Sequence, residues 1–253
     1  MMKERYRIEE LKKENLKLVV ELVRSSFENK YLIPSIYRTK GIEKFISNEL
    51  ENHFSPYRYF VMFENDVIMA YAEYKIFEGQ STAFLNIIAV NNEFKNKGVG
   101  KKIYEYTKNK FLKDGFDTIA LDVYESNKIA LNWYLNFGFI QKKSNSFYEI
   151  DIKKDLEHKS KIFIQNFPHY KELQKIYGFY FLDILIENES YKLGTIEQDI
   201  IVRGNYSESL KNQLSLLSKQ SEINKFYLLG DEKESEELKL IDKIFRMELN
   251  LKL

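Results

Sequence analysis

The segment that most constrains the fold runs from residue 82 to residue 124. Residues 82–90 read as a strand apolar enough to be buried on both faces of a sheet. A short polar turn follows, and Gly98 and Gly100 then open a helix over residues 98–113, in which apolar residues recur at steps of four. Because residues 118–124 read as the next strand, this strand–helix–strand succession requires a parallel pairing within a mixed sheet.

The apolar patterns around this segment predict an α/β fold with a second, smaller α/β domain after residue 153. The charged residues 153–161 read as a linker, so we expect one domain over 1–153 and another over 154–253. In the first domain the patterns predict strands over 5–11, 59–63, 67–77, 82–90 and 118–124, helices over 15–27, 42–54, 98–113 and 127–137, and a closing hairpin of 139–143 with 147–152.

The second domain has a similar order of predicted elements to residues 59–152, which suggests an internal duplication. An unrelated α+β module remains an alternative. The patterns predict strands over 179–187, 193–202, 226–230 and 246–253 and helices over 207–219 and 234–245.

Composition excludes several classes of function. The net charge of +1 gives no basic excess for nucleic acid or an anionic membrane, so a small-molecule or peptide substrate is favoured. The chain has no cysteine, which removes disulfides, thiolate metal sites and a cysteine nucleophile, and its three histidines lie far apart. With neither a signal peptide nor a long apolar run, we expect a cytoplasmic protein that needs no metal and no membrane.

The glycine turn has the features of a phosphate-binding loop. Free N–H groups at a helix N-terminus suit a pyrophosphate, and glycines let its oxygens approach the main chain. The loop is not a P-loop, since Lys102 follows Gly100-Lys101, and it is not a dinucleotide fingerprint, since residue 103 is Ile. Glycines that serve only close packing on the sheet are the alternative. Positive charge is added by Lys95, Lys97, Lys101 and Lys102.

Two spaced motifs resemble the GCN5-related N-acetyltransferase (GNAT) family over residues 4–153. The first is the coenzyme A loop Lys95-Asn96-Lys97-Gly98-Val99-Gly100. The second joins the strand at 121–123 to Asn127, Ala130, Tyr134 and Gly138-Phe139. The resemblance implies a mixed, mostly antiparallel twisted sheet flanked by helices. The remainder of the chain then reads as a degenerate second GNAT-like repeat.

The resemblance also implies that acetyl-CoA, as cosubstrate, lies between two diverging parallel strands, 82–90 and 118–124. Lys95 departs from the usual Gln or Arg of the loop, and since lysine lacks the planar donor fork we expect weaker coenzyme binding. The coenzyme-binding residues implied are Ile88, Ala89, Val90, Lys95, Asn96, Lys97, Gly98, Val99, Gly100, Lys101, Asn127 and Tyr134.

Acyl transfer needs a base for the amine and an acid for the departing thiolate. By the resemblance Tyr134 is the acid, and a tyrosine that only packs in the core is the alternative. Asn127 reads either as a helix cap or as a ligand of pantetheine. The strand before the glycine loop has no acid, so the nearest base candidate is Glu73, acting through water; an exposed strand carboxylate is the competing interpretation.

These features predict an N-acetyltransferase that transfers the acetyl group directly to a primary amine in a ternary complex. A non-catalytic acyl-CoA sensor or an adaptor is the rival. The second domain has one glycine, Gly204, where a Gly-x-Gly would stand, so we expect it to complete the acceptor pocket or to pair subunits as a homodimer. Aromatic residues that either line such a pocket or form ordinary core are Phe163, Phe167, Tyr170, Tyr177, Phe179, Tyr180 and Phe181.

Overall fold

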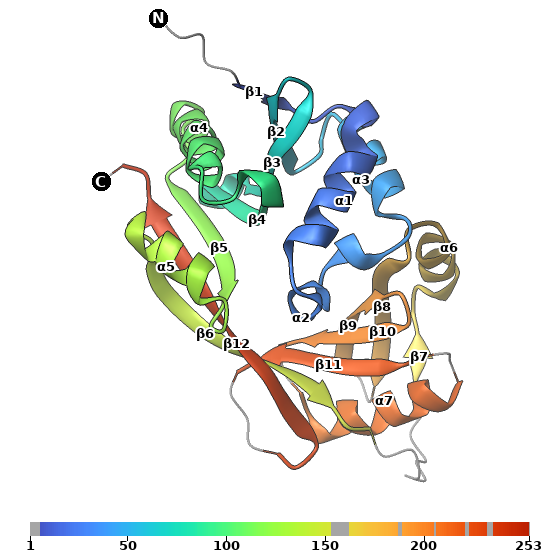
Figure 1. Cartoon of the computed structure of the whole chain (residues 1–253). Helices are drawn as coiled ribbons and strands as arrows, with labels where there is room; N and C mark the ends of the chain where they lie inside the picture. The colour runs from blue at the N-terminus through green and yellow to red at the C-terminus, as the bar shows by residue number, and fades with distance from the viewer. Residues whose placement is uncertain are drawn as a thin grey trace, which may run out of the picture.

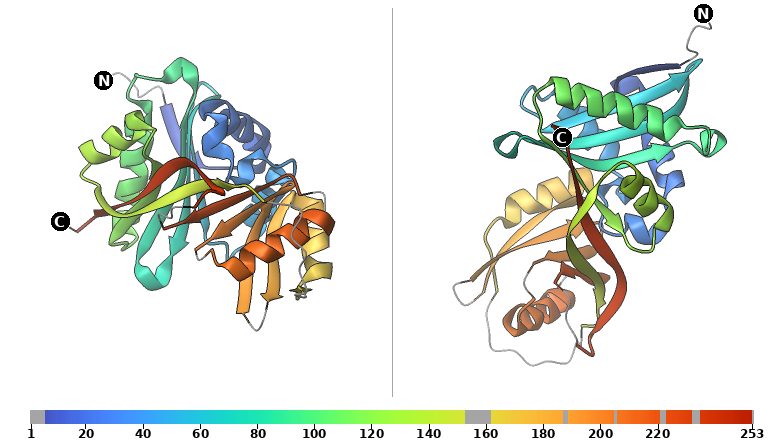
Figure 2. Two further views of the ribbon diagram at one scale, coloured as in Figure 1. Left: turned by 90° about the horizontal axis from the view of Figure 1, so that it is seen from below. Right: turned by 90° about the vertical axis from the view of Figure 1, so that its left-hand side faces the viewer.

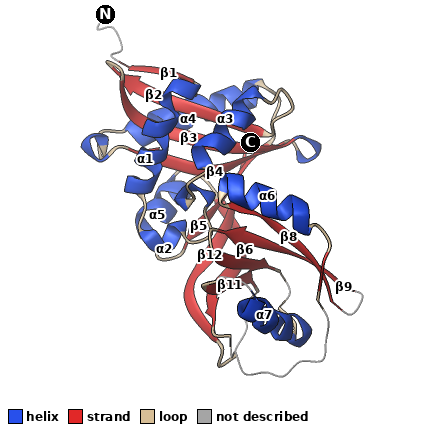
Figure 3. Ribbon diagram, turned by 90° about the vertical axis from the view of Figure 1, so that its right-hand side faces the viewer, coloured by secondary structure: helices blue, strands red, loops and turns tan. Residues whose placement is uncertain are grey.

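In the computed structural model the chain forms one mixed sheet of twelve strands with helices on both faces (Figures 1 and 3). The strand order is β1-β2-β3-β4-β5-β12-β6-β11-β10-β9-β8-β7. Only β4–β5 and β10–β11 pair in parallel among the described strands, which confirms the expected mixed, mostly antiparallel sheet. The structure describes residues 6–152, 162–186, 189–204, 206–220, 223–231 and 235–252.

The strand predicted over residues 193–202 is divided between β9 and β10, and the described elements have the following bounds. The strands are β1 Tyr6–Glu10, β2 Tyr57–Glu64, β3 Val67–Phe77, β4 Thr82–Val90, β5 Thr118–Tyr124, β6 Ile140–Ile150, β7 Phe163–Ile164, β8 Phe179–Ile186, β9 Glu189–Ile196, β10 Asp199–Arg203, β11 Lys225–Gly230 and β12 Leu238–Asn250. The α-helices are α1 Leu16–Ser26, α2 Asn29–Leu32, α3 Ile42–Glu51, α4 Val99–Lys113, α5 Lys128–Asn136, α6 Phe167–Tyr177 and α7 Glu208–Gln220.

The strands β1 to β5 are covered by helices on both faces. On one face Val19, Val23 and Ile46 from α1 and α3 are buried against Val61 and other residues of β2 and β3. On the opposite face Ile103, Phe111 and Tyr134 from α4 and α5 are buried against the other side of the strands. This double cover explains why β3 and β4 are nearly continuous apolar runs rather than alternating ones.

Two long strands, β6 and β12, join the two halves of the chain, residues 6–152 and 162–252 (Figure 2). Each of them pairs with strands of the other half. β12, from the end of the chain, lies between β5 and β6 and pairs with all seven residues of β5. β6, from the first half, pairs with β12 on one side and with β11 of the second half on the other. Each half therefore depends on a strand supplied by the other, although the linker expected at 153–161 lies outside the described residues.

The helix predicted over residues 234–245 is wrong, because this region contributes to β12. Its apolar residues fit both helical spacing and alternation, as in Leu238, Leu240 and Ile244. β5 and β6 would each present an unpaired edge without a strand between them, and unpaired backbone groups are costly to bury. Tertiary pairing thus decided what the local pattern left ambiguous.

The closing hairpin predicted around residues 144–146 is also wrong. Residues 140–150 form one continuous strand, β6, in which Ser144, Asn145 and Ser146 face Phe245, Ile244 and Lys243 of β12. The Ser-Asn-Ser sequence is typical of a turn, but here its backbone hydrogen-bonding capacity is used by the neighbouring strand. The helix α6 was not predicted at all.

The two halves nevertheless repeat one pattern of elements. The run β8, β9, β10, α7, β11, β12 follows the order of β2, β3, β4, α4, β5, β6, apart from α5, which has no counterpart among the described residues between β11 and β12. The domain boundary expected at residue 153 stays a prediction. In the sheet, β12 from the second half lies between β5 and β6 from the first half.

We expect residues 1–153, expressed alone, to show no cooperative urea unfolding. Without β12 the fragment exposes the edge of β5 and both edges of β6, which favours aggregation over folding. Co-expression with residues 154–253 supplies β12 and is expected to restore a soluble complex. A cooperative transition of the isolated fragment, followed by circular dichroism, would contradict the shared-sheet interpretation.

Candidate active site

The central feature of the site is the divergence of two parallel strands. β4 pairs with β5 through four residue pairs only, from Thr82–Thr118 to Leu85–Leu121. Beyond Leu85, β4 continues to Val90 with pairing to β3 alone, and beyond Leu121, β5 continues to Tyr124 with pairing to β12. The main-chain groups on the facing edges are therefore left for another partner, as the sequence analysis expected.

A bulge at Asn86 marks the point of divergence. The register between β3 and β4 shifts there, since Glu73 faces Ile87 whereas Tyr74 faces Leu85. A bulge bends the strand that carries it and re-aims its side chain. Asn86 consequently points toward Glu73 on the face covered by α1 and α3, and it donates a hydrogen bond from Nδ2 to Glu73 Oε1 at 2.9 Å.

The corresponding strands of the second half do not diverge. All five residues of β10 pair with β11, from Asp199–Lys225 to Arg203–Leu229. The turn after β10 contains Gly204 but no second glycine before α7. The second half therefore offers no equivalent gap among its described strands.

The glycine loop presents an open helix N-terminus beside the gap. Gly98 has φ +73°, in the left-handed region, and a Cβ built on it would meet no atom within 4 Å. The first helical hydrogen bond runs from Lys102 N to Gly98 O at 3.1 Å, so the geometry of the helix leaves the N–H groups of Val99, Gly100 and Lys101 without an intrahelical acceptor. Gly100, by contrast, packs closely, because its Cβ would lie 3.3 Å from Val90 Cγ2.

The loop thus combines the two roles that the sequence left open. Gly100 serves close packing on the sheet, whereas Gly98 leaves free space in front of the helix. The first turn of α4 has no acidic residue, and the charge nearby comes from four exposed lysines. These lysines are Lys95, Lys97, Lys101 and Lys102.

On the other face of the sheet, Glu73 is buried within a ring of polar groups. The residue is 4% exposed, which excludes the interpretation as an exposed strand carboxylate. Its Oε2 accepts hydrogen bonds from Tyr37 Oη at 2.5 Å and Tyr71 Oη at 3.2 Å, while Asn86 occupies Oε1. Tyr37 comes from the short 3-10 helix Ile36–Arg38, between α2 and α3, which sequence reasoning did not identify.

Burial raises the pKa of Glu73, and the hydrogen bonds from Tyr37, Asn86 and Tyr71 offset part of that effect. Burial also raises the pKa values of Tyr37 and Tyr71, and the adjacent carboxylate raises them further. The phenols consequently stay protonated, and the carboxyl group is the member of the cluster that changes charge nearest to neutrality.

Tyr134 lies on α5, on the face of the sheet opposite to Glu73, and Asn127 directly precedes that helix. Tyr134 is 7% exposed and packs edge-on against Trp133 and Phe139, and burial raises the pKa of its hydroxyl. Asn127 is the N-cap of α5, since its Oδ1 accepts a hydrogen bond from Ala130 N at 3.1 Å. The capping interpretation of Asn127 is thereby confirmed, and contact with pantetheine stays a prediction.

A second polar cluster ties the end of β5 to β12, and no sequence motif pointed to it. Asp242 accepts hydrogen bonds from Ser126 through its backbone N at 3.2 Å and through its hydroxyl, and Lys30 Nζ lies 3.9 Å from the carboxylate. Ser126 also accepts from Lys30 at 2.8 Å. A residue of the second half therefore holds the turn that leads into α5 and Tyr134.

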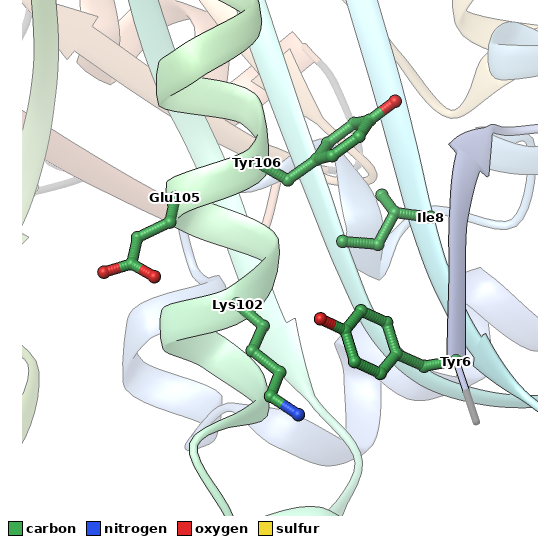
Figure 4. A pocket seen from close by; sticks show the side chains of 5 residues that line it. All are labelled: Tyr6, Ile8, Lys102, Glu105 and Tyr106. Atoms are coloured by element: carbon green, nitrogen blue, oxygen red, sulfur yellow. The ribbon is translucent and has the colours of Figure 1, made fainter. Parts of the chain in front are cut away.

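Two surface hollows lie away from the strand gap. The first is enclosed by β1 and α4, where Lys102 lies over the ring of Tyr6 at 4.4 Å beside Ile8, Glu105 and Tyr106 (Figure 4). The second lies in the second half and includes Glu149, Lys225 and Glu237. Neither contains Glu73, Tyr134 or the glycine loop.

Within the described ranges, no group of three or more histidine, aspartate or glutamate residues is arranged to hold a metal ion. None of the described helices is long and apolar enough to cross a membrane. The aromatic residues of the second half divide between two environments: Tyr177 and Phe179 pack on Phe45 of α3, whereas Phe163 and Phe181 are exposed.

Both halves together have the architecture of a tandem GNAT protein. A tandem GNAT protein from the clavulanic acid biosynthesis pathway superimposes with a TM-score of 0.70 at 8% identity, covering 97% of this chain and 98% of that one. A putative acetyltransferase from Pyrococcus horikoshii gives 0.68 at 12% identity, covering 99% and 91%. At these identities the similarity shows the fold alone.

Residues 17–139 match the sequence model of the acetyltransferase (GNAT) family. This match lies in the first half of the chain, which also contains the divergent strands and the glycine loop.

Proposed function

We propose that this protein is an acyl-CoA-dependent N-acyltransferase that moves an acetyl group from acetyl-CoA directly to a primary amine. The observation that carries the proposal is the gap between β4 and β5, bordered by a helix N-terminus on one side and by a buried carboxylate on the other. This combination offers a place for a thioester and a group that can accept a proton from an amine.

The coenzyme would lie along the free edge of β4 and end at the glycine loop. Amide groups of pantetheine can pair with the main chain at Ile88, Ala89 and Val90, where β4 has no partner strand on that side. The pyrophosphate would be bound by the N–H groups of Val99, Gly100 and Lys101, in the space that Gly98 leaves open. Lys95, Asn96 and Lys97 would border it, and Lys95 and Lys97 would add positive charge.

On the acceptor side, Glu73 would take the proton of the amine. Its carboxylate lies on the face opposite to α4 and adjoins the bulge at Asn86, so a water molecule can connect it to an amine at the strand gap. A raised pKa makes the carboxylate a better proton acceptor, because its conjugate acid is closer in strength to that of an amine. Tyr37 and Tyr71 would hold the carboxylate in place.

Tyr134 would protonate the departing thiolate, and its replacement by Phe tests that role. We expect kcat to fall roughly 10²-fold with acetyl-CoA affinity nearly unchanged, which is the usual scale for a lost general acid. Tyr104→Phe is a matched control, because it removes a buried hydroxyl that lacks a partner among the described residues and lies in the same aromatic cluster. Equal activity of the two variants would leave Tyr134 as a core residue.

The proposed function is tested by CoA release across a panel of amines. The absence of cysteine makes a thiol-specific dye suitable, since the protein contributes no thiol of its own. Amine-dependent release of CoA supports the proposal. Binding of acetyl-CoA without release would favour a sensor, and a stoichiometric partner that co-purifies while acetyl-CoA fails to bind would favour an adaptor.

We also propose that the acceptor is a small-molecule or peptide amine and that the protein acts in the cytoplasm as a homodimer. The acceptor would approach between the segment around α2 and the second half, because Lys30 and Asp242 meet at the end of β5. Since the second half has no strand gap of its own, we propose that it completes the acceptor site rather than binding a second coenzyme.

A further inference from the structure

A positively charged side chain without an ionic partner stands beside the proposed acceptor site. Arg203 ends β10, and no described residue forms an ion pair or a hydrogen bond with its guanidinium group. The side chain is exposed, and desolvation lowers the pKa of its guanidinium group. Among the other described arginines, Arg7, Arg38 and Arg246 form ion pairs, and Arg24 and Arg58 donate to backbone carbonyl groups.

Strand pairing places Arg203 in one row with residues of the first half. It pairs with Leu229 of β11, Leu229 with Phe147 of β6, and Phe147 with Asp242 of β12. Arg203 also lies two residues from Ile201, which is buried with Phe147 and Ile244 on the face that meets Tyr124. The arginine therefore borders the same cluster as the end of β5.

Tyr124 faces this row from the end of β5. Its ring packs on Tyr31 of α2 at 4.8 Å and on Phe147 at 6.4 Å, while its hydroxyl is buried with no hydrogen-bond partner among the described residues. Buried hydroxyls are normally satisfied, so an orphan hydroxyl marks a place where a partner is missing. Burial raises the pKa of Tyr124, and the positive charge of Arg203 offsets part of that rise.

The nearby acidic groups form their ion pairs and hydrogen bonds with other residues, although the charge of Asp122 also favours the charged form of Arg203. Asp122 binds Arg246 through two hydrogen bonds, at 2.6 and 3.0 Å. Asp242 accepts the hydrogen bonds of Ser126 and faces Lys30. The guanidinium group of Arg203 and the phenol of Tyr124 therefore have donor groups available, and together these donors fit a carboxylate.

We propose that Arg203 and Tyr124 bind a carboxylate of the acceptor, so that the substrate is an amine that also carries a carboxylate. The inference rests on the proposed function and refines it. Tyr124 is the last residue of β5, three residues beyond the last pair of β4 with β5, so it lies on the edge that borders the gap opposite the free end of β4. The second half would thus supply the residue that selects the substrate, although it binds no coenzyme.

The test compares matched acceptors in the full chain. A series of ω-amino acids is assayed against n-alkylamines of equal length, together with α-amino acids and their decarboxylated amines, with acetyl-CoA held saturating. For the carboxylated acceptors we expect Arg203→Gln to raise KM about 10- to 100-fold and to leave kcat almost unchanged, the scale of a lost hydrogen bond to a charged group. The KM of the uncharged amines should not move.

Three variants control this comparison. Arg203→Lys should recover part of the loss, since lysine keeps the charge but not the planar fork. Tyr124→Phe should raise KM less than Arg203→Gln. Lys192→Gln removes an exposed cation elsewhere in the second half and should change nothing.

Two results would overturn the inference: equal KM values for carboxylated and plain amines in the unmodified protein, or equal effects of Arg203→Gln on both. If no amine releases CoA, the proposed function has failed separately. The same amines are then tested by thermal shift in the presence of CoA. Stabilisation by carboxylated amines that Arg203→Gln removes supports the carboxylate site, and its absence refutes it.

Discussion

Gly98→Glu is expected to abolish the stabilisation of the protein by acetyl-CoA. The open space in front of α4 would be filled by a side chain, and a negative charge would occupy the position proposed for the pyrophosphate. A ligand that binds only the folded state raises the melting temperature with concentration, so the loss is read from the thermal shift. At acetyl-CoA concentrations about 100 times Kd, the unmodified protein should gain about 2.7 kcal/mol that the variant does not.

Gly115→Glu separates loss of binding from backbone strain. Gly115 lies at the opposite end of α4, has φ +86° and is likewise surrounded by open space, so a side chain there meets the same left-handed penalty. Both variants should unfold at lower temperature than the unmodified protein. Only Gly115→Glu should still respond to acetyl-CoA, and a normal response of Gly98→Glu would remove the loop from the site.

Glu73→Gln is expected to lower kcat by about 10²-fold or more, because glutamine keeps the shape of the side chain but cannot accept the proton of the amine. In the unmodified enzyme, activity should rise with pH as Glu73 loses its proton, at a pH above the usual range for a carboxyl group because burial raises its pKa. This limb of the pH–rate profile should disappear in the variant. Glu64→Gln, a strand carboxylate of β2 outside the cluster, should retain both activity and profile.

The same substitution should increase stability at neutral pH. Because the pKa of Glu73 is raised in the folded protein above the 4.5 of a free carboxyl, the folded chain holds a proton that the unfolded chain has released. Between these two pKa values the free energy of unfolding falls as the pH rises. Glutamine does not ionise, so Glu73→Gln does not lose stability in this way. The variant and the unmodified protein should have similar stabilities below the pKa of Glu73 in the unfolded chain and should diverge above it.

Urea titrations over a pH series measure this divergence. A constant difference between Glu73→Gln and the unmodified protein at every pH would show that Glu73 has an ordinary pKa and is a structural residue. Lower activity with higher stability, in contrast, is the behaviour of a functional group that is costly to bury.

The sequence by itself determined the local features of the site. The glycine loop, the strand before it and the helix carrying Tyr134 were all predicted, because each depends on interactions within some twenty residues: a buried strand, a left-handed glycine and a helix cap. The motifs also identified the family over the first half of the chain.

Only the tertiary structure decided the environment of Glu73, the position of β12 and the neighbours of Arg203. Glu73 reads like any strand carboxylate until Tyr37, Tyr71 and Asn86 are folded around it. Residues 234–245 fit a helix as well as a strand, and the unpaired edges of β5 and β6 selected the strand. The choice of a strand depends on pairing with β5 and β6, which lie some 90 to 130 residues earlier in the chain, and local periodicity does not encode such partners.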